Sequence, residues 1–181
     1  GLPARFDSIK PHIPILALYA EDEKILSAGK LWNTYGYHLK MIADYSGAHF
    51  TFERALKIFE EILGKGHSNV ASVVNNLGSV RKDMGDLVGA RAAFERALKI
   101  DEASFGLNHP NVARDVNNLG SVMNDLGDLN GARAAFERAL KIWEANLGTE
   151  HPQVATGVNN LGSVMHDLGD LAGAREAYER A

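Results

Sequence analysis

The 181-residue chain is mildly acidic, with 19 Lys and Arg against 23 Asp and Glu and a formal net charge of −4. This balance argues against a nucleic-acid partner, because such proteins usually carry clustered basic residues. The absence of cysteine excludes disulfides and thiolate metal sites. The longest apolar run, residues 13–20, is too short to span a bilayer and contains Pro14. We therefore expect no membrane partner and a cytoplasmic location.

Residues 1–24 differ from the rest of the chain, which is repetitive. Apolar residues recur in this stretch at helical spacing. Pro11 and Pro14 are compatible with a first helical turn, so the pattern predicts a helix from about Pro11 or Pro14 to about Lys24. We expect this helix to cap the first helix pair; the alternative is the tail of a further helical unit.

The rest of the chain repeats itself with a fixed 42-residue period. The string VNNLGSVMNDLGDLNGARAAFERALKI at 116–142 has a close copy at 74–100 and another, incomplete, at 158–181. Residues 109–139 and 151–181 agree at 24 of 31 positions, which is enough to indicate a repeat array. The predicted units are the divergent 25–66, then 67–108, 109–150 and the truncated 151–181.

Each repeat is predicted to form two helices. In residues 109–150, apolar residues of the first helix follow one another by four or three positions, which gives one apolar stripe. Gly127 then ends this helix, Asp128 caps the second one, and Gly148 ends the second with a left-handed residue. Neither stripe can be buried alone, so the sequence predicts an all-α solenoid of antiparallel helix hairpins.

A glycine recurs in the middle of each first helix, as at Gly120. Glycine there costs about 1 kcal/mol relative to alanine, so its repetition predicts a close approach between helices. We expect Gly120 to face small or aromatic neighbours such as Ala132 and Phe136.

The spacing of Leu119-Gly120, Ala132, Phe136 and Ala139 resembles the tetratricopeptide repeat, although the period is longer than is usual for that family. The HPxVAxxxNNLG opening and the 42-residue period are similar to kinesin light chain and to the sensor arrays of bacterial and archaeal STAND signalling ATPases. This resemblance implies a right-handed α-solenoid. It also implies that the first helix of each hairpin lines a concave groove for a peptide or partner segment.

The candidate peptide-binding residues are polar and lie on the first helices, opposite the apolar stripe. They are Lys30, Asn33, Tyr37, Lys40, Ser72, Asn75, Ser79, Lys82, Arg114, Asn117, Ser121, Asn124, Thr156, Asn159, Ser163 and His166. A carboxamide both donates and accepts hydrogen bonds, which suits a peptide backbone. In each Asn-Asn pair we assign the first residue to the groove and the second to bonds between neighbouring helices. The first residues are Asn75, Asn117 and Asn159, and the second are Asn76, Asn118 and Asn160.

The charges predict an orientation for the ligand. The cations Lys30, Lys40, Lys82 and Arg114 belong to the N-terminal half of the proposed groove, so acidic residues of a peptide should lie near the first two repeats. On the second helices the charges are expected to form a solvated face of pairs four positions apart. These pairs are Glu53/Lys57, Glu95/Lys99 and Glu137/Lys141.

No catalytic motif is found in the sequence. Ser121, Asp125 and His109 could be written as a triad, but each recurs at the same place in other repeats. Repeated positions spread along a solenoid and do not converge on one point, so we expect no enzymatic activity. The same argument makes His109 and its equivalents, His67 and His151, residues of helix starts or loops and not metal ligands. We expect no cofactor and no metal.

Three functions remain open. The first is an interaction module that binds a peptide or protein segment, as part of a larger signalling or scaffold protein. The second is a self-assembling solenoid whose repeats stack between chains, and the third is the sensor of a STAND ATPase. The chain begins without Met and stops inside a repeat, so we expect a fragment of a longer protein. At its truncated end we expect end-to-end association, because little would cover the apolar side chains there. These are Val164, Leu168, Leu171 and Tyr178.

Overall fold

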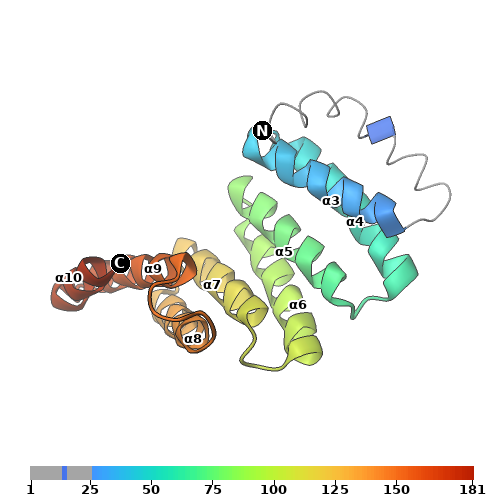
Figure 1. Ribbon diagram of the computed structural model, residues 1–181. Coiled ribbons are helices and arrows are strands. Elements are labelled where there is room, and N and C mark those ends of the chain that lie inside the picture. Colours follow the sequence, from blue (N-terminus) through green and yellow to red (C-terminus); the bar gives the residue numbers. More distant parts are fainter. Residues whose placement is uncertain (1–13, 16–25) are drawn as a thin grey trace, which may run out of the picture. The chain divides into compact units, whose positions relative to one another are not determined.

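The computed structural model describes residues 14–15 and 26–181, and in these residues it contains helices and turns but no strand (Figure 1). The helix predicted for residues 11–24 lies outside the described residues, apart from Pro14 and Ile15, which are helical. The helices that follow are α3 (Leu26–Met41), α4 (Tyr45–Leu63), α5 (Ser68–Asp83), α6 (Leu87–Phe105), α7 (Pro110–Asp125), α8 (Leu129–Leu147), α9 (Pro152–Asp167) and α10 (Leu171–Arg180).

The chain divides into two compact units, residues 1–86 and 87–181. In the first unit α3 packs on α4 and α4 packs on α5; in the second, each helix from α6 to α10 packs on the next. First helices have 16 residues and complete second helices have 19. The all-α architecture of helix pairs is therefore confirmed, while the exact limits of the repeats stay a prediction.

Histidine side chains begin three of the first helices. The Nδ1 atom of His67 accepts the backbone N–H of Asn69 at 3.1 Å, and His109 makes the equivalent bond at 3.1 Å. His151 repeats this cap for α9 at 3.2 Å. A helix N-terminus leaves several N–H groups without partners, and each imidazole satisfies one of them. The assignment of these histidines to helix starts is confirmed.

The second helices begin and end as the sequence predicts. Asp128 accepts the backbone N–H of Gly131 at 3.0 Å at the start of α8. Gly148 follows the last residue of α8 with a φ of +83°, which L-residues with side chains rarely adopt. Gly127 after α7 has a φ of +84°. Aspartate and glycine thus set the length of each hairpin.

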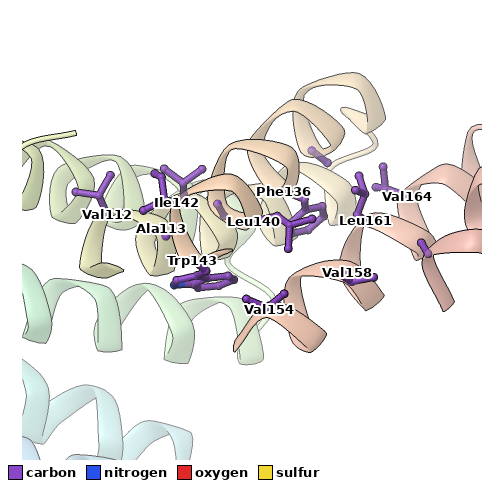
Figure 2. Packing of buried hydrophobic residues seen from close by; sticks show 14 residues of the cluster. Val112, Ala113, Phe136, Leu140, Ile142, Trp143, Val154, Val158, Leu161 and Val164 are labelled. Atoms are coloured by element: carbon purple, nitrogen blue, oxygen red, sulfur yellow. The ribbon is translucent and has the colours of Figure 1, made fainter. Parts of the chain in front are cut away.

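The core of the second unit lies where α8 meets α7 and α9. Figure 2 shows Phe136, Trp143 and Val158 among the buried side chains there. Phe136 and Trp143 are each 3% exposed. Burying apolar surface contributes about 25 cal/mol for each Å² removed from water. Each helix pair therefore depends on the next pair for its stability, as the two apolar stripes of the sequence indicate.

Gly120 allows one of the closest helix contacts in this core. A Cβ atom at this position would lie 3.0 Å from Cε1 of Phe136 and 3.1 Å from Cβ of Ala135. The predicted approach to Phe136 is confirmed, and Ala135 is a small neighbour that the sequence analysis did not name. A side chain at position 120 would push α7 away from α8, which explains the mid-helix glycine.

The apolar side chains at the last hairpin are better covered than the sequence suggests. The expectation of a poorly covered Val164 is wrong: this residue is fully buried, because it packs in the same cluster as Ala177 of α10. Leu168 is partly buried against this cluster, whereas Leu171 and Tyr178 are 63% and 48% exposed. The exposed apolar surface at α10 is thus limited to the last two of these residues.

The glutamates of the second helices form ion pairs with arginine and not with lysine. Arg91 Nε lies 2.9 Å from Glu95, and Arg133 Nε lies 2.9 Å from Glu137. Arg175 and Glu179 repeat this pair at 2.7 Å. The planar guanidinium offers directed donors to a carboxylate, whereas lysine is a point charge on a flexible chain. The predicted pairing of Glu95 and Glu137 with lysines is replaced by pairing with the arginine one turn earlier.

Candidate functional site on the first helices

In the first unit, α3 and α5 lie side by side and, together with α4, line an open cavity of about 350 Å³. The residues that line it are Lys30, Asn33, Thr34, Phe59, Asn69, Ser72 and Val73. Three of them, Lys30, Asn33 and Ser72, belong to the predicted peptide-binding set. The fold therefore brings together side chains from two successive repeats, because the repeat places equivalent positions on adjacent first helices.

The asparagine pairs form hydrogen bonds between repeats. Nδ2 of Asn76 donates to Oδ1 of Asn33 at 2.9 Å, and Nδ2 of Asn160 donates to Oδ1 of Asn117 at 2.9 Å. The second asparagine of a pair therefore bridges to the first asparagine of the preceding repeat. The bridging role predicted for Asn76 and Asn160 is confirmed in both units.

The same bonds correct the expected position of the first asparagines. Asn75 is 6% exposed and Asn117 is 8% exposed, so their side chains are buried and not open to a peptide. Asn117 is already an acceptor for Asn160. In the second unit, α7 and α9 approach closely enough for Asn160 to reach Asn117. Of these three first asparagines, Asn159 alone is exposed, as a residue of a peptide-binding groove should be.

Most of the predicted cations are also engaged within the protein. Lys40 donates to the hydroxyl of Ser79 and lies 3.3 Å from a carboxylate oxygen of Asp83. Lys82 also has a partner. Lys30 is exposed and forms no ion pair with any residue in the described part of the chain. Of the predicted cations in the first unit, Lys30 is therefore the one whose charge no described residue balances.

In the second unit, Arg114 of α7 lies between two buried carboxylates. Its Nη2 atom is 2.7 Å from Oδ1 of Asp115 and 3.3 Å from Oδ2 of Asp101. Both aspartate side chains are 0% exposed, whereas that of Arg114 is 30% exposed. Oδ1 of Asp101 and Oδ2 of Asp115 are buried without a hydrogen-bond partner. One arginine therefore serves two carboxylates that are largely removed from water.

This arrangement changes the protonation of the aspartates. Burial raises the pKa of Asp115 to about 7; Arg114 opposes this rise and the nearby Asp101 adds to it. Burial also raises the pKa of Asp101, against the attraction of Arg114. Two like charges at one buried place favour a state in which one group keeps its proton. Near neutral pH the pair therefore shares one proton, and Arg114 balances the remaining charge.

Asp101 and Asp115 are not among the site residues predicted from the sequence. A signal was present, because both positions carry apolar residues or glycine in the neighbouring repeats. The equivalents are Phe59 and Trp143 for the first position, and Val73 and Gly157 for the second. An aspartate at a core position of a repeat indicates a local polar cluster, and a comparison of the repeats position by position would have found it.

The remaining candidates differ in exposure from helix to helix. Tyr37 is 58% exposed, while Ser121 and Asn124 are partly buried. On α9 the exposed candidates follow one another at helical spacing and lie on one side of the helix. They are Thr156, Asn159, Ser163 and His166. Peptide binding by any of these residues stays a prediction.

Metal-binding clusters and membrane spans are both absent from residues 14–15 and 26–181. No group of three or more histidine or acidic residues there could hold a metal ion. No helix among these residues has the length and apolar character needed to cross a membrane.

Comparison with known proteins gives a consistent match. A family model described as tetratricopeptide repeat matches residues 29–103, 69–123 and 115–181. BtubC (BKLC) from P. vanneervenii is 24% identical, with a TM-score of 0.76 over 99% of this chain and 80% of that one. The nearly identical TPR-like repeats of a Podosopora anserina protein, described as a putative kinesin light chain, are 15% identical, with a TM-score of 0.79 over 96% and 84%.

The apo form of RapI has the same fold at 17% identity, with a TM-score of 0.73 over 86% of this chain and 42% of that one. No curated protein matches the sequence.

Proposed function

Because the chain belongs to the tetratricopeptide repeat family, a fold that generally serves protein interaction and not catalysis, we propose that its first helices bind an extended segment of a partner protein. The observation that carries this proposal is the cavity between α3 and α5, which gathers Lys30, Asn33 and Ser72 from two repeats. The cavity combines a cation, amides and hydroxyls with the apolar side chains of Phe59 and Val73. Such a lining suits a peptide that carries both polar and apolar groups.

The ion pairs of the predicted cations narrow the choice of partner for this cavity. Lys40 is balanced by Asp83, and Arg114 is balanced by two aspartates. An acidic side chain of the partner would therefore meet Lys30, and the other predicted cations would contribute little attraction. The proposal is an extended segment with one acidic residue placed at Lys30 and its backbone near Asn69 and Ser72.

The test compares Lys30→Glu with Lys57→Glu, an exposed position on α4. Peptides selected from a random display library on the unmodified protein serve as ligands, and affinities are measured by fluorescence polarisation at low and high salt. We expect Lys30→Glu to weaken binding of acidic peptides roughly tenfold, and salt to weaken it in the unmodified protein. Equal affinities for both variants would refute the proposed site.

Self-association is the second candidate, favoured by the exposed apolar side chains of Leu171 and Tyr178 on α10. These residues line an open cavity of about 380 Å³ together with His166, Ala174, Arg175 and Glu179. Light scattering over a range of concentrations tests this function. A mass that increases with concentration, and returns to that of the monomer in Leu171→Ser, would support it.

A further inference from the structure

Another cavity occurs in the second unit, where α8 and the loop 106–109 that precedes α7 form its lining. It has a volume of about 510 Å³. Its lining residues are Leu107, Asn108, Arg138, Lys141, Ile142, Ala145 and Asn146. None of these residues belongs to the first helices, so this cavity is separate from the site proposed above.

The walls of this cavity are fixed by side-chain contacts. Nδ2 of Asn146 donates to the backbone oxygen of Asn108 at 3.0 Å and to that of Ile142 at 2.8 Å, which ties the loop to α8. Phe105 and His109 stand at the two ends of the loop, and their rings stack with centroids 4.3 Å apart. A preformed site avoids part of the ordering cost of binding.

The lining combines apolar side chains with two cationic ones, Arg138 and Lys141. Leu107 is 61% exposed in this loop, although it is a large apolar residue. Lys141 has no ion-pair partner among the described residues, because Glu137 is held by Arg133 at 2.9 Å. Arg138 pairs with Glu102 at 2.6 Å. The cavity itself contains no acidic residue.

We propose that this cavity is a second docking site, for an acidic amphipathic segment of a partner protein. A leucine-like side chain of the segment packs against Leu107 and Ile142, and a carboxylate about one helical turn away pairs with Lys141. Charge complementarity selects this partner: the only charged residues in the lining are cations, and Lys141 is the one that no residue of the described chain neutralises.

The neighbouring repeats do not carry the same side chains. The residues at the positions of Leu107 and Asn108 are Lys65 and Gly66 in the preceding repeat, and Thr149 and Glu150 in the following one. Lys99 is the equivalent of Lys141, and the equivalent of the exposed leucine one period earlier is a lysine, Lys65. The proposed site belongs to one junction and is not a general property of the repeat.

The test uses two synthetic probes, acetyl-LELLEE-amide and its lysine counterpart acetyl-LKLLKK-amide, titrated into the isotope-labelled 181-residue chain. We expect the glutamate peptide to shift the amide signals of Leu107, Asn108, Lys141 and Ala145, and the lysine peptide to leave them unchanged. Equal shifts with both peptides, or shifts confined to α3 and α5, would overturn the proposal.

Two variants and a matched control complete the experiment. Lys141→Glu and Leu107→Ser should each weaken binding of the glutamate peptide roughly threefold to tenfold, because each removes one of the two proposed contacts. Lys99→Glu makes the same charge change one repeat earlier and should leave the affinity unchanged. An equal loss in Lys99→Glu would mean general charge attraction and would refute the site. Retained affinity in both Lys141→Glu and Leu107→Ser would refute it as well.

Discussion

The second unit joins its helices in two different ways at equivalent positions of the repeat. Where α8 meets α9, Trp143 lies against Gly157, and a Cβ at that glycine would be 3.2 Å from the indole ring. Where α6 meets α7, the same positions hold Asp101 and Asp115, which Arg114 balances. The same repeat backbone therefore accepts two kinds of helix contact at these positions. One is the aromatic joint of Trp143 and Gly157, and the other is the polar joint of Asp101, Asp115 and Arg114.

The two joints differ in the free energy of burying their side chains more than in their position in the repeat. Burial of Trp143 does not depend on pH, because the indole carries no titratable group and most of the buried surface is apolar; its Nε1–H is nevertheless buried without a hydrogen-bond partner. The joint of Asp101 and Asp115 must offset the loss of water around two carboxylates, and it does so through Arg114 and one shared proton. Replacing a buried ion cluster with apolar residues is often neutral or stabilising. We therefore expect the α6–α7 joint to be the weaker and the more pH-sensitive of the two.

The largest effect is expected when the aromatic joint is broken. Trp143→Ala should lower the free energy of unfolding by about 3–5 kcal/mol, since it removes a buried side chain and leaves a void beside Gly157. Asp101→Ala, at the same position one repeat earlier, should change it by less than about 1 kcal/mol, because it also removes one of two like charges. Chemical denaturation followed by circular dichroism measures both. Similar losses in the two variants would contradict the comparison.

The polar joint can be converted into an apolar one by copying the first unit. Residues Phe59, Ser72 and Val73 occupy the equivalent positions there. The triple variant Asp101→Phe, Arg114→Ser and Asp115→Val should raise the free energy of unfolding by about 1–4 kcal/mol at neutral pH. Chemical denaturation near pH 7 measures the change. A loss of stability would show that the ion cluster contributes more than the apolar contact it replaces.

The polar joint should also make stability depend on pH. In the unfolded chain an aspartate loses its proton near pH 4, whereas folded Asp115 keeps it up to about pH 7. The folded state binds the extra proton between these values. The free energy of unfolding should therefore fall as pH rises, by up to about 1.4 kcal/mol per unit, and level off above the folded pKa.

The control for this pH dependence is Asp115→Asn, because the chain contains many other ionisable side chains. The difference between the two proteins isolates the aspartate. Denaturation curves recorded between about pH 5 and pH 8 give the slopes. An equal slope in Asp115→Asn would assign the pH dependence to other groups.

The smallest effects concern the asparagine bridges. Asn117→Ala should cost about 1 kcal/mol, because it leaves the part-buried amide of Asn160 without its acceptor. Asn159→Ala removes an exposed side chain from α9 and should be neutral or stabilising by a few tenths of a kcal/mol, since alanine is the better helix former. Thermal midpoints of the two variants give the comparison. A midpoint of Asn117→Ala above that of Asn159→Ala would refute the bridge.

The sequence determined the order and type of the elements, and the reasons are local. A fixed repeat period, apolar stripes at helical spacing and the Asp and Gly signals at helix ends act within one or two turns of chain. Cap residues such as Asp128 and His109 were therefore predictable from their neighbours alone. The contact between Gly120 and Phe136 was also predictable, because a repeated glycine in a helix indicates a close approach.

Tertiary structure decided which polar side chains remain available. Asn117 and Asn159 stand at the same repeat position, yet one is buried as a hydrogen-bond acceptor and the other is exposed. Likewise, Arg114 and Lys30 are both cations of first helices, but only Arg114 is balanced by carboxylates. One of these carboxylates, Asp101, comes from another helix. Periodicity assigns a residue to a face of its helix, whereas burial and charge pairing depend on neighbours 13 to 43 residues away, which only the packed helices bring together.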